Sequence, residues 1–97
     1  MQYMKAILIA KAKEVRDDGS IVEIVIWELP APVLPCTHRY KYRLYYGITG
    51  ICLIRYDNER GKGDHCHRGG QEKFYNFTTV DQLLLDFEKD VNQWSTR

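Results

Sequence analysis

The stretch that decides the fold lies at residues 38–46 and reads His-Arg-Tyr-Lys-Tyr-Arg-Leu-Tyr-Tyr. Every second position carries a large apolar or aromatic side chain: Tyr40, Tyr42, Leu44 and Tyr46. The positions between them carry Arg39, Lys41, Arg43 and Tyr45. Because successive side chains of a strand point to opposite faces, this alternation predicts a β-strand with one face in the core and one basic face.

A hairpin is predicted before this strand. The dipeptide Asp18-Gly19 separates a mixed apolar run at 5–13 from the run 21–27, which is dense in β-formers and ends in Trp27. Asp-Gly between two such runs is a strong hairpin signal. We expect Trp27 to belong to the core. Prolines at 30, 32 and 35 then exclude a helix or a central strand and predict a connecting loop.

The segments after residue 46 complete a sheet and add a helix. A Gly-containing turn at 47–50 leads to a fourth strand at 51–57, and residues 72–77 can add a short fifth strand. Near the C-terminus, Thr79 with Gln82 has the form of a capping box. An apolar stripe follows at helical spacing: Val80, Leu83, Leu84, Phe87, Val91 and Trp94. This pattern leaves for solvent the polar positions Asp86, Glu88, Lys89, Asp90 and Gln93.

Together these patterns predict an α+β domain spanning residues 1–97. Its expected architecture is an antiparallel sheet of four to five strands with one C-terminal helix packed on one face. The length of 97 residues suits one domain, and 44% hydrophobic with 28% charged residues is typical of a globular chain. The net charge of +1 indicates no class of partner.

Composition excludes several other classes. No apolar run approaches the roughly 18 residues that a transmembrane helix requires, so no membrane association is expected. Three cysteines at positions 36, 52 and 66 have neither the even count of a disulfide framework nor the paired spacing of a zinc finger. We therefore expect a cytoplasmic protein with no structural metal and no cofactor.

The segment Tyr56–Gly70 concentrates the side chains that can carry chemistry. It is rich in glycine and contains His65 and His67, which point to the same face if the segment is extended. They can act as acid and base on a phosphodiester whose charge is neutralised by Arg and Lys side chains, or ligate a metal with Asp57 or Asp64. The alternative is a solvated hairpin loop. Cys66 would point away from both histidines.

A second candidate is the basic face of the strand at 38–46. Arg39, Lys41 and Arg43 can follow a nucleic-acid backbone, and neighbouring tyrosines can stack on unpaired bases. The alternative is an ordinary amphipathic strand whose cations pair with Glu23 and Glu28 on the next strand.

The order of these motifs resembles the TumE-like family of toxins from two-gene toxin–antitoxin modules. The similarity runs over roughly residues 11–91. Its most specific part is Tyr56-Asp57-Asn58 followed by Gly61-Lys62-Gly63-Asp64-His65-Cys66-His67. The resemblance implies a cytoplasmic toxin neutralised by a helix-turn-helix antitoxin. It also carries over the site positions Tyr56, Asp57, Arg60, Lys62, Asp64, His65 and His67.

The candidate residues and the family resemblance lead to three hypotheses about function. The leading one is a small metal-independent ribonuclease in which His65 and His67 share the acid and base roles. Arg60, Lys62 and Arg68 would hold the phosphate of the RNA, and Asp64 would orient a histidine. The second is a non-catalytic RNA- or protein-binding module that uses Arg39, Lys41 and Arg43. The third is a metal-dependent nuclease that uses the His65/His67 pair. The oligomeric state stays open, with a homodimer among the options.

Overall fold

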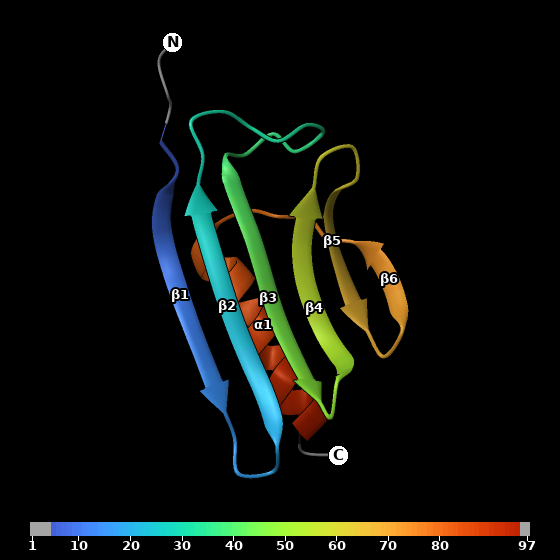
Figure 1. The fold of residues 1–97 in the computed structure, drawn as a ribbon. Coiled ribbons are helices and arrows are strands. Elements are labelled where there is room, and N and C mark those ends of the chain that lie inside the picture. Colours follow the sequence, from blue (N-terminus) through green and yellow to red (C-terminus); the bar gives the residue numbers. More distant parts are fainter. Residues whose placement is uncertain (1–4, 96–97) are drawn as a thin grey trace.

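A computed structural model describes residues 5–95 as one antiparallel sheet and one helix (Figure 1). The elements in chain order are β1 (Ile7–Val15), β2 (Ser20–Glu28), β3 (Tyr40–Ile48), β4 (Ile51–Glu59), β5 (Gly63–Arg68), β6 (Gln71–Phe74) and α1 (Val80–Ser95). The strand order across the sheet follows the chain, so every strand pairs with its sequence neighbour. The α+β class and the C-terminal helix are as predicted.

The first hairpin forms at the Asp-Gly turn, as predicted. Val15 of β1 pairs with Ile21 of β2. The carboxylate of Asp18 accepts hydrogen bonds from the backbone N–H of Ser20 at 2.8 Å and from its hydroxyl at 2.6 Å. Gly19 has a φ of 86°, a left-handed conformation that glycine adopts at little cost. The turn therefore closes on local chemistry alone.

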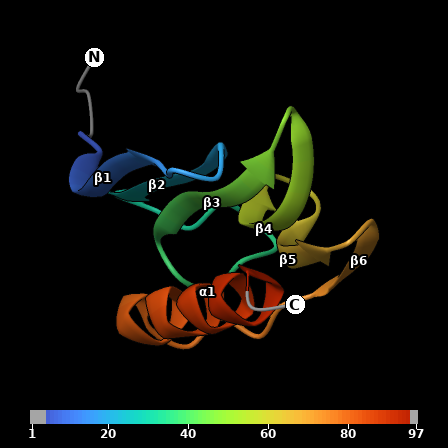
Figure 2. The same cartoon turned by 90° about the horizontal axis from the view of Figure 1, so that it is seen from below.

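Helix α1 covers one face of the sheet (Figure 2). It begins after Thr79, whose hydroxyl oxygen accepts the N–H of Gln82 at 3.0 Å, which confirms the hydroxyl half of the predicted capping box. The Gln82 side chain donates to Asp86 at 2.8 Å. Buried residues of α1 pack against the inward side chains of β2–β5. This core comprises Ile26, Tyr42, Leu44, Tyr46, Ile54, Tyr56, Cys66, Tyr75, Leu83, Phe87 and Val91. Within residues 5–95, α1 lacks the length and the apolar composition that a membrane-spanning helix needs.

The sheet has six strands, so the prediction of four to five was too low. The additional strand is β5, which lies within the polar segment that the sequence left without an element. Glycine and charged residues are poor β-formers, and β5 has no alternating apolar pattern. It is a strand because β4 supplies its backbone partners, with Asp57 opposite His65 and Arg55 opposite His67. Tertiary pairing therefore overrides local propensity here.

Two side chains lie where the sequence did not predict them. Asp90, expected in solvent, is buried, accepts a hydrogen bond from the Tyr56 hydroxyl and lies 2.8 Å from Arg68 Nε. Its ion pair with Arg68 makes this burial tolerable. Trp27, expected in the core, is 36% exposed. Its position in β2 alternates with buried Ile26, so it faces away from α1.

The face of the sheet opposite α1, hereafter the open face, is polar over β3, β4 and β5. Because side chains alternate along each strand, the positions between the core residues of β3, β4 and β5 must lie there. They are Lys41, Arg43, Tyr45, Arg55, Asp57, His65 and His67. The open face thus combines the basic positions of β3 with most of the ionisable groups that β4 and β5 place outside the core.

The same substitution at two leucines of α1, one buried and one exposed, tests how the helix packs on the sheet. Leu83 is 0% exposed and Leu85 is 59% exposed. Leu83→Ala should lower the free energy of unfolding by about 2–5 kcal/mol, because it removes buried methyl groups and leaves a cavity. Leu85→Ala should change it by no more than about 0.5 kcal/mol. Urea denaturation monitored by tryptophan fluorescence measures both. Equal losses for the two variants would contradict the placement of α1.

Candidate functional site

Strand register places the polar side chains of the open face in two neighbouring rows across the sheet. In the first row Arg43, Asp57 and His65 lie opposite one another on β3, β4 and β5. In the second row Arg55 on β4 pairs with His67 on β5, which pairs with Glu72 on β6. Side chains opposite each other on one sheet face have Cβ atoms about 4.5–5.5 Å apart. The rows therefore bring these side chains within reach of their neighbours on the adjacent strand.

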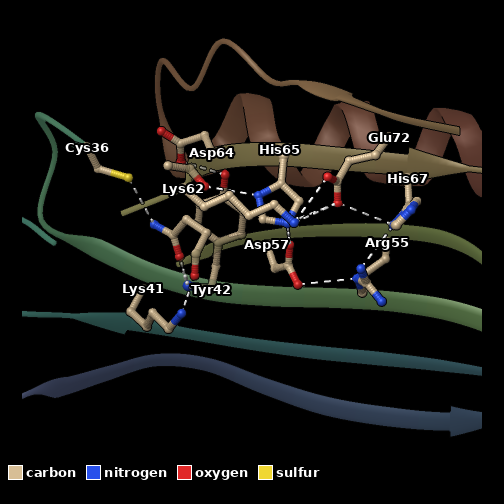
Figure 3. Close-up of polar contacts among 12 residues, drawn as sticks. Cys36, Lys41, Tyr42, Arg55, Asp57, Lys62, Asp64, His65, His67 and Glu72 are labelled. Atoms are coloured by element: carbon tan, nitrogen blue, oxygen red, sulfur yellow. Dashed lines mark hydrogen bonds and ion pairs between the residues drawn. The ribbon is translucent and has the colours of Figure 1, made fainter. Parts of the chain in front are cut away.

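The contacts form one connected set, called here the open-face cluster (Figure 3). Its members are Arg55, Asp57, Lys62, His65, His67 and Glu72. Asp57 lies at its centre, with Oδ1 2.5 Å from His65 Nε2 and Oδ2 3.2 Å from Arg55 Nε. Arg55 Nη2 is 2.9 Å from His67 Nδ1. Glu72 lies 3.1 Å from Lys62 Nζ and within 3.8 Å of both imidazoles.

Both ring nitrogens of His65 face protein atoms. Nδ1 is 3.0 Å from the carbonyl oxygen of Gly63, and Nε2 faces Asp57. The side chain is only 5% exposed. In this arrangement both ring nitrogens of His65 face protein atoms, so His65 is poorly placed to exchange a proton with a bound ligand. His65 and His67 share one face, but their surroundings differ.

His67 and Glu72 are the accessible members of the cluster. The His67 side chain is 26% exposed, and its Nδ1 is taken by Arg55, so the Nε2 edge points outward. Glu72 is exposed, and the hydrogen bond from Lys62 lowers the pKa of its carboxyl, with a smaller opposing effect of burial. The cluster thus presents a carboxylate beside an imidazole, which is a pair suited to proton transfer.

A groove of about 360 Å³ lies on the open face next to Asp57. Trp27 forms part of its wall, and Lys41 and Arg43 supply positive charge. The guanidinium of Arg43 lies 5.1 Å from the centre of the Tyr45 ring. An exposed indole beside cations is the combination that binds single-stranded nucleic acid by stacking and by phosphate contacts.

Asp64 belongs to a second cluster on the side of α1. Its Oδ1 accepts a hydrogen bond from the Tyr42 hydroxyl at 2.6 Å and lies 2.7 Å from His38 Nε2. Burial first, and then the bond to Asp64, raise the pKa of Tyr42, so the phenol stays protonated and donates. The His38 ring stacks on Phe77 with centroids 3.9 Å apart. Asp64 thus contacts His38, and alternation directs it away from His65 and His67.

The structure therefore separates the predicted site residues. It brings Asp57, Lys62, His65 and His67 together on the open face, with Lys41 and Arg43 beside them. Tyr56, Asp64, Cys66 and Arg68 point toward α1 instead. Arg60 lies in the exposed turn between β4 and β5, and Arg39 pairs with Glu28 at 3.3 Å. Burial raises the pKa of the Cys66 thiol, consistent with its predicted position away from the histidines.

The family comparison covers both clusters. The sequence model of the family described as Toxin TumE matches residues 5–95. The chain belongs to the TumE toxin family. This membership confirms the resemblance carried by the Tyr56–His67 motif, and a toxin of this kind implies a cognate antitoxin. No curated protein and no solved structure matches the chain. The roles of individual residues in this TumE-family toxin are therefore argued from the geometry of its own structure.

Sequence reasoning missed three members of this toxin's open face. Arg55 and Glu59 lie on β4 on either side of Asp57, and Glu72 lies on β6. The i, i+2 spacing of Arg55, Asp57 and Glu59 was a readable signal, because it places all three on one strand face. Glu72 had no such signal. Its contact with His65 and His67 depends on the β5–β6 register, which only the folded sheet determines.

His38 and His65 of the toxin should carry opposite tautomers. His38 Nδ1 accepts the N–H of Tyr40 at 3.1 Å, so its proton lies on Nε2, facing Asp64. His65 Nδ1 donates to the Gly63 carbonyl, so Nδ1 is protonated. Long-range ¹H–¹⁵N correlation spectra at neutral pH measure this directly. An unprotonated Nδ1 in His65, or a protonated Nδ1 in His38, would contradict the assigned hydrogen bonds.

Proposed function

We propose that this TumE-family toxin cleaves RNA at the open-face cluster. The observation that supports it best is the grouping of Glu72, His67, Arg55 and Lys62 around a buried Asp57–His65 pair, beside a groove to which Lys41 and Arg43 contribute positive charge. Phosphodiester cleavage needs a proton acceptor, a proton donor and positive charge for the phosphate. The cluster supplies all three from neighbouring strands.

Glu72 and His67 are the proposed proton-transfer groups. The Glu72 carboxylate takes the proton of the ribose 2′-hydroxyl, whose oxygen attacks the adjacent phosphorus. For this step His67 is protonated, with its Nδ1–H toward the Glu72 carboxylate 3.8 Å away. The imidazolium donates its Nε2 proton to the departing 5′-oxygen and becomes neutral, so one RNA fragment ends in a cyclic phosphate and the other in a free 5′-hydroxyl. Arg55 Nη2 lies 2.9 Å from His67 Nδ1 in the neutral ring, an arrangement that directs Nε2 outward. Asp57 contacts Arg55, and His65 contacts Glu72, so these two buried residues position the proton-transfer groups.

Cationic side chains bind the substrate in this proposal. Lys62 and Arg55 lie beside the reacting groups and stabilise the negative charge that grows on the phosphate. Lys41 and Arg43 extend positive charge into the groove, where Trp27 offers a ring for an unpaired base. We therefore assign single-stranded RNA as the substrate class.

A second candidate is an RNA-binding module without catalysis. The groove with Trp27, Lys41 and Arg43 favours it, because these side chains can bind RNA without the open-face cluster. Measuring both RNA binding and RNA cleavage distinguishes the binding module from the nuclease. Binding without cleavage, unaffected by changes at His67, would support the module and refute the nuclease.

We also propose that the partner is a helix-turn-helix antitoxin and that both act in the cytoplasm. Family membership supports an antitoxin, and the resemblance noted in the sequence supports its type. Co-expression of the neighbouring gene should suppress toxicity and yield a co-purifying complex.

His67→Ala should reduce RNA cleavage by about 10²–10⁴-fold, because it removes one member of an acid–base pair. Expression of the wild-type chain should arrest growth, and the variant should relieve that arrest while its circular dichroism spectrum stays unchanged. Labelled RNA incubated with purified protein measures the rate. Full cleavage by a folded His67→Ala variant would refute the proposed role.

Two lysines on opposite faces provide a matched pair for the phosphate contact. Lys62 belongs to the open-face cluster, whereas Lys73 pairs with Cys66 and lies with it on the other face. Lys62→Ala should lower the cleavage rate by about 10²-fold, in the range seen when one stabilising donor is removed. Lys73→Ala should leave it unchanged. Equal effects would indicate a nonspecific dependence on net charge.

Arg43→Ala should weaken RNA binding and reduce the slope of log affinity against log salt by about one unit, because one phosphate contact is lost. Fluorescence anisotropy with a labelled single strand at several salt concentrations measures the slope. Arg39→Ala is the control, since Arg39 is paired with Glu28. An unchanged slope for Arg43→Ala would remove this residue from the RNA path.

A further inference from the structure

A backbone carbonyl of β5, the strand that carries His65, fixes the orientation of the His65 ring. Its Nδ1 lies 3.0 Å from the carbonyl of Gly63, two residues earlier. Gly63 has a φ of 82°, a conformation that other residues rarely adopt, and an added Cβ would lie 3.3 Å from Pro35. With Nδ1–H donated to this carbonyl, the neutral ring presents the lone pair of Nε2 to Asp57. A backbone carbonyl behind one ring nitrogen is the usual support of a metal-ligating histidine.

His65 Nε2 and Asp57 Oδ1 face each other as an ion pair only if His65 is protonated, and residues 5–95 give neither atom a hydrogen bond. Nε2 and Oδ1 are 2.5 Å apart, but within residues 5–95 neither buried atom makes a hydrogen bond of acceptable geometry. A neutral imidazole lone pair and a carboxylate oxygen repel each other at this distance. Buried polar atoms in native proteins are nearly always satisfied. A positive charge shared by both atoms would satisfy them.

Glu59 completes a set of three ligands. The ligating atoms of Asp57, Glu59 and His65 all lie within 4.8 Å of one another. Glu59 is the last residue of β4 and is exposed, and it lines the groove together with Asp57. We propose that these three residues bind one divalent cation at the end of the groove. This proposal deepens the proposed function, on which its role in RNA cleavage rests.

The donor set indicates which ions are suitable. Two carboxylates favour ions such as Mg²⁺ and Mn²⁺, and an imidazole favours ions such as Zn²⁺ and Fe²⁺. Mn²⁺ accepts both kinds of donor and is the probe chosen below. Three protein ligands leave coordination positions for water or a phosphate oxygen. Bound there, the cation would neutralise charge on a phosphate in the groove.

The cluster on the other face is a natural comparison. The ligating atoms of Cys36, His38 and Asp64 also lie within 4.8 Å of one another. There, however, the Tyr40 N–H occupies Nδ1 of His38, so Nε2 carries the proton and donates it to Asp64. A protonated nitrogen cannot ligate a metal. Although the distances in the two clusters are similar, the position of the histidine proton predicts metal binding at Asp57, Glu59 and His65 and not at Cys36, His38 and Asp64.

Titration of the purified full-length chain with Mn²⁺, followed by electron paramagnetic resonance, tests the proposal without RNA. We expect uptake of one ion per chain. Glu59→Gln should weaken this binding by more than about tenfold, since losing even an outer-shell partner has effects of about 10–100-fold. Asp57→Asn should weaken it likewise, and Cys36→Ser should leave it unchanged. Glu59 is exposed, so Glu59→Gln is expected to fold, and its melting temperature verifies this.

Two results would overturn the proposal. One is absence of Mn²⁺ uptake at millimolar concentration, which would mean that a proton holds the Asp57–His65 pair together. The other is binding that survives Glu59→Gln and disappears in Cys36→Ser, which would place the ion on the wrong face. Mn²⁺ uptake by a chain that cleaves no RNA would refute the proposed function and leave the cation site standing.

Discussion

The register between β4 and β5 is the constraint on which the rest of the site depends. Tyr56 and Cys66 are opposite one another and both face the core, so burial on that side fixes the pairing. Asp57 and His65 must then meet on the open face. A slip by one residue would turn every β5 side chain to the other face and place His65 against α1. The apolar face thus determines the geometry of the polar one.

The two faces of this strand pair carry different chemistry at adjacent positions. Asp64 points toward α1 and contacts Tyr42 and His38, whereas His65, the next residue, points to the open face and contacts Asp57. On the α1 side the buried polar groups donate and accept in matched pairs. On the open face the hydrogen-bonding pattern is incomplete. This difference, rather than the number of charged residues, distinguishes a structural cluster from a functional candidate.

Burial of incompletely paired charge costs stability. Arg55, Asp57 and His65 each have a buried polar atom without a hydrogen-bond partner among residues 5–95. A buried group left wholly unsatisfied typically costs about 1–3 kcal/mol, and the contacts of Asp57 with Arg55 and His65 reduce that cost here. The apolar packing of α1 on the opposite face offsets this cost. Proteins commonly retain such destabilising arrangements where activity requires them, and the groove beside Asp57 is consistent with that interpretation.

The sequence by itself determined the hairpin at Asp18-Gly19, the alternating strand at 38–46, the capped helix and the family. Each depends on local propensity, on a short-range pattern or on a motif. It also located His65, His67, Lys62 and Asp57 in one segment. Only the tertiary structure decided that this segment is a strand, that Asp64 and Tyr56 face α1, and that Arg55 and Glu72 join the histidines. Cross-strand register produces those contacts, and register depends on the burial of residues far apart in the chain, which no local pattern records.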